Sequence, residues 1–191
     1  MQKKYKCLLF DLDGTLLDTA PEFLTCLNFL LKKNKKKSVT YDFVRNRVSD
    51  GVGRLIQDSF FIDENHSEFE GLRTDLLDEY IKSYLMSKTF PGVDEFLNEL
   101  SSNKIDWMIV TNKPKKFSQE ICEKYDWHNL AAAIVSPEDV DGKRKPDPAS
   151  LDAALTKTTI KKEHCIYIGD NWRDIEAANN SGIDSALALY G

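Results

Sequence analysis

Five short apolar runs, separated by helical stretches of about ten residues, constrain the fold of this chain more than any other feature. The runs occupy residues 5–10, 105–110, 131–135, 165–168 and 185–189, and helix-period patterns occupy 94–101, 115–125, 148–156 and 172–181. Short apolar runs that end at polar or turn residues are typical of buried strands. Strands that alternate with helices pack as a mostly parallel sheet with helices on both faces, so the predicted fold class is α/β.

The segment from about residue 17 to 88 interrupts this alternation. It carries helix-period patterns and no convincing strand, which predicts a helical bundle inserted after the first strand. An insertion that leaves and re-enters the sheet beside one strand end is well placed to act as a lid. We therefore expect a core domain made of residues 1–16 and 89–191, and a helical cap domain made of residues 17–88.

Composition excludes several classes of protein. A chain of 191 residues can bury an adequate core without disulfides or a structural metal, and no apolar run approaches the roughly 20 residues of a membrane helix. The four cysteines form no close pair, and no export signal is recognisable, so reduced thiols in the cytoplasm are expected. The net charge of −5 opposes nucleic-acid binding, and the lysine cluster at 32–37 is expected to be a solvated surface.

Polar residues gather just after the predicted strands, where ligands of parallel sheets bind. They are Asp11 and Asp13 after the first run, Thr111 and Asn112 after the second, Lys145 before the helix at 148–156, and Asp170 and Asp174 after the fourth. Carboxylates that converge in a cleft repel one another unless a cation neutralises them. Oxygen ligands without His or Cys select a hard ion, and the predicted cofactor is Mg²⁺.

These residues belong to four motifs that resemble, in order, those of the haloacid dehalogenase superfamily. The motifs read DLDGTLLDT at 11–19, VTNK at 110–113, KPDP at 145–148 and IGDNWRD at 168–174, and the resemblance covers nearly the whole chain. It implies a Rossmann-like core with an inserted helical cap, and hydrolysis through an aspartyl-phosphate. The second aspartate of DLD favours phosphate chemistry over displacement of halide, because only phosphate chemistry has a leaving alcohol to protonate.

The resemblance also implies a role for each site residue. Asp11 would be the nucleophile and Asp13 the general acid and base. Asp11 and Asp170 would hold Mg²⁺ with their carboxylates and Asp13 with its backbone carbonyl, while Asp174 would orient metal-bound water and the lysine. The phosphoryl oxygens would be held by the Thr111 hydroxyl, the Asn112 backbone amide and the Lys145 ammonium, and also by the backbone amides of Gly14 and Thr15.

Two assignments stay open from the residues alone. Lys143 and Arg144 compete with Lys145 for the role of the site's cation, and only the resemblance selects Lys145. The segment 50–56 resembles the cap loop of phosphoglycolate phosphatases, in which Arg54 would bind a substrate carboxylate. A helix–helix turn with an exposed arginine is an equally good interpretation of this segment.

The leading hypothesis is a Mg²⁺-dependent phosphatase for a small phosphorylated metabolite, without a nucleic-acid or membrane partner. The alternatives are a phosphomutase acting on a sugar phosphate, similar to beta-phosphoglucomutase, and a non-catalytic binding protein of the same fold. Phosphoglycolate-phosphatase-like chains usually continue beyond the point that matches Gly191 with a further strand and helix. An exposed sheet edge is therefore expected, which a second copy of the chain, forming a homodimer, could cover.

Overall fold

The computed structural model describes residues 5–191, which divide into two compact units. The first, here called the core unit, contains the chain up to Leu17 together with Thr89–Gly191, and the second, the helical unit, contains Asp18–Lys88. Two short strands, β2 (Leu17–Asp18) and β3 (Lys88–Thr89), pair with each other, and each spans one of the two boundaries between the units. A role of the helical unit as a cap stays a prediction.

The core unit is built on a five-stranded parallel sheet in the order β5-β4-β1-β6-β7. The strands are β1 (Cys7–Phe10), β4 (Asp106–Val110), β5 (Ala133–Val135), β6 (Cys165–Gly169) and β7 (Asp184–Leu187). Because β1 lies at the centre, its last residue Phe10 is level with Ile109 of β4 and Ile168 of β6. The carboxyl ends of these three strands therefore meet at one edge of the sheet.

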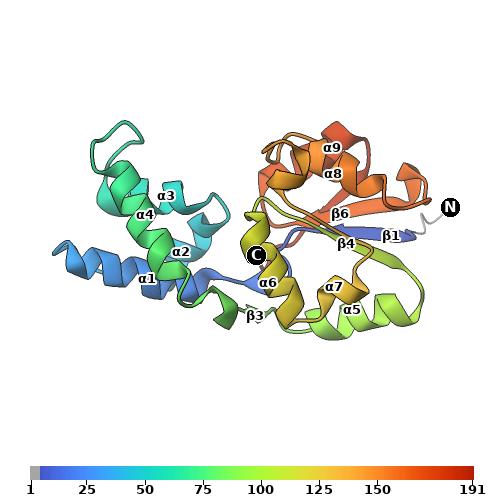
Figure 1. The fold of residues 1–191 in the computed structure, drawn as a ribbon, viewed down its shortest axis with the longest axis horizontal. Coiled ribbons are helices and arrows are strands. Elements are labelled where there is room, and N and C mark those ends of the chain that lie inside the picture. Colours follow the sequence, from blue (N-terminus) through green and yellow to red (C-terminus); the bar gives the residue numbers. More distant parts are fainter. Residues whose placement is uncertain (1–4) are drawn as a thin grey trace. The chain divides into compact units, whose positions relative to one another are not determined.

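Helices cover both faces of this sheet, with α8 and α9 on one side and α5, α6 and α7 on the other (Figure 1). Their bounds are α5 (Val93–Ser102), α6 (Lys115–Lys124), α7 (Trp127–Leu130), α8 (Ala149–Leu155) and α9 (Trp172–Ser181), with 3-10 turns η2 (Pro137–Val140) and η3 (Lys162–His164). This arrangement confirms the predicted α/β class with a parallel, Rossmann-like sheet.

Burial on both faces explains why the strands read as nearly continuous apolar runs. Every residue of β4 from Trp107 to Val110 is at most 1% exposed, and Leu9 in β1 is fully buried. The indole of Trp107 meets that of Trp127 edge to face, with ring centroids 6.5 Å apart. The core thus anchors the strands whose ends carry the candidate site.

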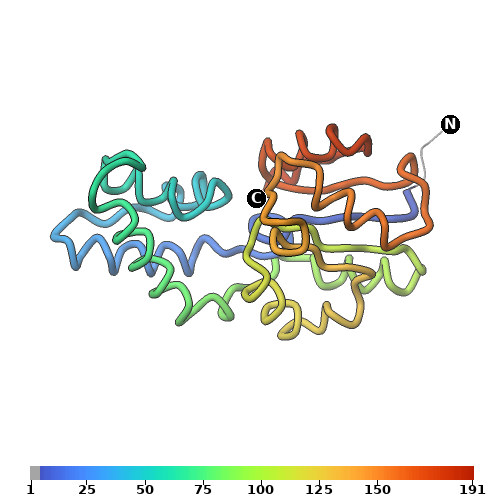
Figure 2. Tube along the Cα trace, turned by 45° about the horizontal axis from the view of Figure 1, so that its top comes forward, coloured from blue at the N-terminus to red at the C-terminus, as the bar shows by residue number. Residues whose placement is uncertain are grey.

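The helical unit consists of α1 (Ala20–Lys33), α2 (Tyr41–Val48), α3 (Val52–Phe60), α4 (Phe69–Tyr80) and the 3-10 turn η1 (Tyr84–Met86). Their succession can be followed from blue to green in the trace of Figure 2. The ring of Phe23 in α1 stacks on Tyr80 of α4 with centroids 4.0 Å apart, and Leu27 and Leu76 are fully buried between the same helices. Helices α1 and α4 therefore pack on each other through an apolar interface.

Two further observations bear on the environment of the chain. Within residues 5–191, no helix is both long enough and apolar enough to cross a membrane. The four cysteines, Cys7, Cys26, Cys122 and Cys165, are all buried as free thiols. Burial raises the pKa of Cys7 and Cys122 to about 12, so these thiols stay protonated and behave as apolar core groups.

Candidate active site

The loop after β1 carries two of the predicted site residues, Asp11 and Gly14. Asp11 is 9% exposed, and its amide donates to the carbonyl of Ile168 (2.9 Å), so the hydrogen bonding between β1 and β6 extends to Asp11. Gly14 has φ +87°, and a Cβ there would lie 2.2 Å from Oδ2 of Asp170. Only glycine therefore lets this loop approach Asp170. The Gly14 amide already donates to Leu17 O (2.8 Å), so Gly14 contributes close approach rather than a spare donor.

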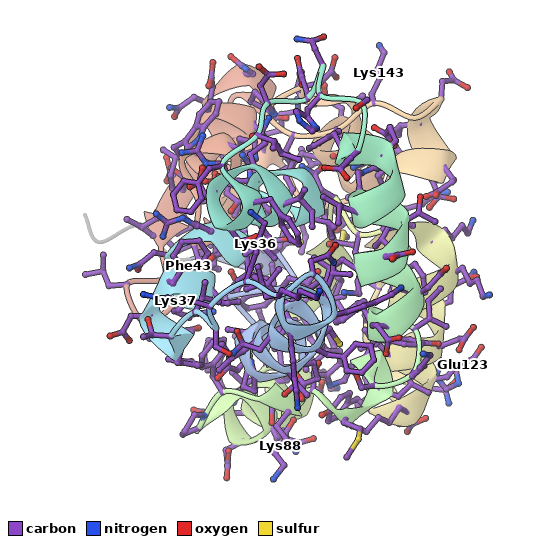
Figure 3. All side chains as sticks on the ribbon, turned by 90° about the vertical axis from the view of Figure 1, so that its left-hand side faces the viewer. Lys36, Lys37, Phe43, Lys88, Glu123 and Lys143 are labelled. Carbon is purple, nitrogen blue, oxygen red and sulfur yellow. The ribbon has the colours of Figure 1, made fainter. Side chains whose placement is uncertain are left out.

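A buried lysine joins the carboxylates at the ends of β1 and β6. Lys145 is 4% exposed, and its Nζ lies 2.8 Å from Oδ1 of Asp11 and 2.7 Å from Oδ1 of Asp174. Its neighbours Lys143 and Arg144 are exposed, and the side chain of Lys143 extends outward from its loop in Figure 3. Burial and contacts therefore distinguish Lys145 from both neighbours, which the residues alone could not do.

The backbone of Lys145 is held by Asn112. The Lys145 amide donates to Oδ1 of Asn112 (2.8 Å), and Nδ2 of Asn112 donates to the Lys145 carbonyl (3.2 Å). Thr111 beside it is 2% exposed, and its hydroxyl oxygen accepts a hydrogen bond from the amide of Lys113 (3.0 Å). The loop after β4 thus fixes the loop that carries Lys145 through two hydrogen bonds that resemble those between paired strands.

Asp174 is held from several directions at the start of α9. Its Oδ2 accepts from the Asn171 amide (3.0 Å), and the Asn171 side chain accepts in return from the first turn, which forms a capping box. Its Oδ1 accepts from Lys145 Nζ. Gly169 lies so close that a Cβ there would come within 2.4 Å of the Asp174 side chain. Packing and hydrogen bonds leave Asp174 little rotational freedom.

Burial and charge act together on the titration of this cluster. Burial raises the pKa of Asp11 to about 8 and outweighs the opposing effect of Lys145, while the carboxylates of Asp174 and Asp170 raise it further. Burial alone would lower the pKa of Lys145, but the adjacent Asp11 and Asp174 more than reverse that effect, so its pKa is raised. The lysine therefore stays charged, and the carboxylates around it exceed the charge that it can neutralise.

The carboxylates of Asp11, Asp170 and Asp174 each place an oxygen within 4.8 Å of the others. Three oxygen donors at this spacing, with neither His nor Cys among them, fit a hard divalent cation such as Mg²⁺. The Thr15 hydroxyl lies 3.4 Å from Oδ1 of Asp170 on the approach from the β1 loop. The donor set therefore fits the metal that the sequence predicts.

Comparison with known proteins identifies the family. The family described as "Haloacid dehalogenase-like hydrolase" matches residues 8–188 of the 191. The chain belongs to this family. It is 31% identical over 189 residues to an N-acetylmuramic acid 6-phosphate phosphatase of Pseudomonas putida, an alignment that covers 98% of this chain and 84% of the relative. It is 34% identical over 189 residues to a phosphoglycolate phosphatase of Xylella fastidiosa, with 97% of this chain and 81% of the relative covered.

Solved structures show the same fold. A haloacid dehalogenase-like hydrolase from Bacteroides fragilis superposes with a TM-score of 0.84 at 23% identity, covering 98% of this chain and 89% of the other. A predicted phosphoglycolate phosphatase from Haemophilus somnus gives a TM-score of 0.83 at 24% identity, covering 100% of this chain and 88% of the other. The predicted resemblance and the predicted class, a hydrolase of the haloacid dehalogenase-like family, are confirmed.

Two polar residues of this haloacid dehalogenase-like site were not anticipated from the sequence. Tyr167 in β6 is fully buried, and its hydroxyl accepts from Lys145 Nζ (2.6 Å) and donates to Val110 O (2.8 Å). Lys113 is 7% exposed, and its Nζ lies 3.0 and 3.1 Å from the two carboxylate oxygens of Asp13. The available signals were a tyrosine inside an apolar strand two residues before Gly169, and a lysine directly after the Thr-Asn pair.

Arg54 lies in the helical unit, in the first turn of α3. Its Nε lies 3.1 Å from Oδ2 of Asp58, which also accepts from Nε of Arg47 (2.7 Å), and half of the Arg54 side chain is exposed. Gly51 precedes the helix with φ +92°, a conformation that favours glycine. The guanidinium therefore has one carboxylate partner within its own unit and a solvent-facing side, and binding of a substrate carboxylate stays a prediction.

Proposed function

We propose that this chain is a Mg²⁺-dependent phosphatase that hydrolyses a small phosphomonoester through an aspartyl-phosphate on Asp11. The observation that carries the proposal is the position of Asp11, buried at the centre of the sheet edge with Lys145 at 2.8 Å and two further carboxylates alongside. A carboxylate placed between a fixed cation and a metal site is suited to attack phosphorus, because the positive charges offset its repulsion by the phosphate.

In the first step, an oxygen of Asp11 forms a bond to phosphorus while the bond from phosphorus to the ester oxygen breaks. Asp13 delivers a proton to that departing oxygen, so the product leaves as a neutral alcohol. In the second step, Asp13 removes a proton from the water that attacks phosphorus. The bond from phosphorus to Asp11 breaks, and inorganic phosphate and the free carboxylate remain.

Mg²⁺, when bound, supplies Lewis-acid neutralisation of the phosphoryl oxygens. We assign its ligands to the carboxylates of Asp11 and Asp170 and to the backbone carbonyl of Asp13. Asp174 is assigned an orienting role rather than direct ligation. In support, its two oxygens already accept hydrogen bonds from Lys145 and from the Asn171 amide.

The phosphoryl group is assigned to donors from three loops. Lys145 supplies a fixed positive charge, and the Thr111 hydroxyl and the Asn112 backbone amide are assigned as donors from the end of β4. Thr15 closes the set from the β1 loop, beside Asp170. Gly14 is assigned the role of letting this loop approach Asp170, because its amide is engaged by Leu17 O.

For the substrate, we propose a phosphomonoester that also carries a carboxylate. The two named relatives are phosphatases for N-acetylmuramic acid 6-phosphate and for phosphoglycolate, which differ in size but share a phosphate ester and a carboxylate. Arg54 is the cation that we assign to this carboxylate. A cytoplasmic location fits such a metabolite and is supported by the four free thiols.

The test is release of inorganic phosphate from a matched panel of esters, with Mg²⁺ and with chelator. The panel contains 2-phosphoglycolate, N-acetylmuramic acid 6-phosphate and N-acetylglucosamine 6-phosphate, which lacks the carboxylate. We expect Mg²⁺-dependent release that is lost in Asp11→Asn. Acid quenching of the wild-type reaction is expected to trap one phosphoryl group on the peptide that contains Asp11.

Arg54→Gln separates the substrate assignment from the reaction. Loss of an ion pair to substrate is expected to raise KM about tenfold for the two carboxylate-bearing esters and to leave N-acetylglucosamine 6-phosphate unchanged. An equal effect on all three esters would contradict the assignment of Arg54. Transfer of the phosphoryl group to a second sugar hydroxyl instead of water would indicate a mutase, and no reaction with any ester would indicate a binding protein.

A further inference from the structure

Lys113 is a buried lysine whose charge is directed at Asp13. It lies in the loop between β4 and α6, and only 5% of its side chain is exposed. A buried ammonium is costly unless it is paired, and Nζ is paired with both oxygens of Asp13 at 3.0 and 3.1 Å. Asp13 itself keeps 23% of its side chain exposed, so the pair extends from the protein interior to the surface of the core unit.

The backbone of Asp13 is already fixed by other contacts. Asp13 forms a β-bridge with Leu17, and the amides of Leu16 and Leu17 both donate to Leu12 O (3.0 and 2.9 Å), which closes the loop after β1. The freedom that remains to Asp13 is rotation of its side chain. A cation bound to both carboxylate oxygens restricts that rotation, which a bond to one oxygen would do less effectively.

The site contains two buried lysines, and each is bound to a different aspartate of the Asp11–Asp13 pair. Lys145 contacts Asp11 and Asp174, whereas Lys113 contacts Asp13. Stability alone does not account for a second ion pair, because buried pairs are often no more stabilising than apolar residues of similar volume. The geometry points instead to a function of Lys113 that is exerted through Asp13.

We propose that Lys113 is a positioning residue that holds the Asp13 carboxyl group where it exchanges protons with the leaving oxygen and with water. The proposal rests on the role assigned to Asp13 above. Proton transfer needs the two heavy atoms within hydrogen-bond reach, and a displacement of about 1 Å is enough to reduce the rate about 10²-fold. When Asp13 carries the proton on one oxygen, the other oxygen still accepts from Lys113.

The dependence on the leaving group tests this role. An alkyl ester such as 2-phosphoglycolate needs a proton on its departing oxygen, whereas 4-nitrophenyl phosphate releases a stable phenolate without one. For Lys113→Met we expect kcat/KM, which reports formation of the aspartyl-phosphate, to fall about 10²-fold for the alkyl ester. For 4-nitrophenyl phosphate we expect a loss of less than about threefold, because that step does not need Asp13.

A double-mutant comparison isolates the pathway through Asp13. In the Asp13→Asn background, Lys113→Met is expected to cause no further loss of kcat/KM on the alkyl ester, because the group that Lys113 positions is already absent. Lys115→Met is the matched control. This variant removes the first lysine of α6, whose side chain is 42% exposed and pairs with Asp139. It is expected to leave kcat/KM unchanged on both esters.

Three results would overturn the proposal: equal losses on both esters, a further loss in the Asp13→Asn background, or a selective rise of KM, which would indicate contact with substrate. Lys113→Gln keeps a neutral donor to Asp13 and gives the same comparison of esters if Lys113→Met does not fold. Failure of the proposed function itself would look different, because wild-type protein would release no phosphate from either ester.

Discussion

Tyr167→Phe removes one hydroxyl from the buried contacts of Lys145 and leaves every charged residue in place. The hydroxyl accepts from Lys145 Nζ at 2.6 Å and donates its proton to Val110 O at 2.8 Å, with Asp174 Oδ1 as an alternative acceptor at 3.2 Å. A hydrogen bond to a charged group contributes about 1.5–3 kcal/mol and a neutral one about 0.5–1.5 kcal/mol. Lys145 keeps its two carboxylates, and Val110 O keeps Lys145 Nζ at 3.2 Å, so no partner becomes unsatisfied. We therefore expect the free energy of unfolding to fall by about 2–4 kcal/mol, without an added desolvation penalty.

The assay for this prediction is urea unfolding, in which a lower midpoint at constant slope reports lost stability. Tyr190→Phe is the matched control, because Tyr190 is 55% exposed and its hydroxyl donates to the neutral acceptor Thr15 O (3.0 Å). The free energy of unfolding of this control is expected to fall by about 1 kcal/mol or less. Activity should fall by about tenfold or less, since the carboxylates still hold the lysine. If Tyr167→Phe were as stable as wild type, the hydrogen bonds of the Tyr167 hydroxyl would contribute nothing to stability, and the reasoning would be refuted.

Two further predictions concern Gly14 in the loop after β1 and Asp11, the proposed nucleophile. Gly14→Ala is expected to abolish phosphate release, because its Cβ would meet Asp170 at 2.2 Å. Gly182→Ala is the control, because Gly182 has φ +71° but open space around it. We expect the control to lower the free energy of unfolding by about 1 kcal/mol and to leave phosphate release unchanged. The pKa of Asp11 is raised to about 8, so the folded state holds a proton that the unfolded state has lost. In chelator, the urea midpoint should therefore fall as the pH rises from about 4 to about 8, and Asp11→Asn should flatten this dependence; an unchanged slope would contradict the raised pKa.

The fold and the gathering of the site were predictable because they depend on periodicity. Apolar runs gave the strands, and parallel strands necessarily bring their carboxyl ends to one edge, which places Asp11, Thr111 and Asp170 together. The sheet order, with β1 between β4 and β6, makes those three ends neighbours. No detail of side-chain packing was needed for this part of the prediction.

The contacts of individual side chains could not be predicted from the sequence, because they depend on loop paths and on side-chain orientation. Lys143, Arg144 and Lys145 are adjacent cations, and only the path of their loop buries the third. Lys113 resembles any lysine ahead of a helix until its loop directs Nζ to Asp13. Tyr167 reads as an apolar strand residue, and only the alternation of β6 turns its hydroxyl toward Lys145.

The charges at the site connect the proposed metal ligands, the proposed nucleophile Asp11 and the second buried lysine, Lys113. Among the described residues, the cluster brings together the carboxylates of Asp11, Asp13, Asp170 and Asp174 and the ammonium groups of Lys113 and Lys145. With all of them ionised, four negative charges meet two positive ones, and one divalent cation would balance the two negative charges that remain. Without a cation the cluster can reduce this excess by taking up a proton, which agrees with the raised pKa of Asp11. Because Lys113 pairs with Asp13, the uncompensated charge is shared by the three carboxylates around Lys145, which are those of Asp11, Asp170 and Asp174. Two of these, Asp11 and Asp170, are the carboxylates that we assign to Mg²⁺.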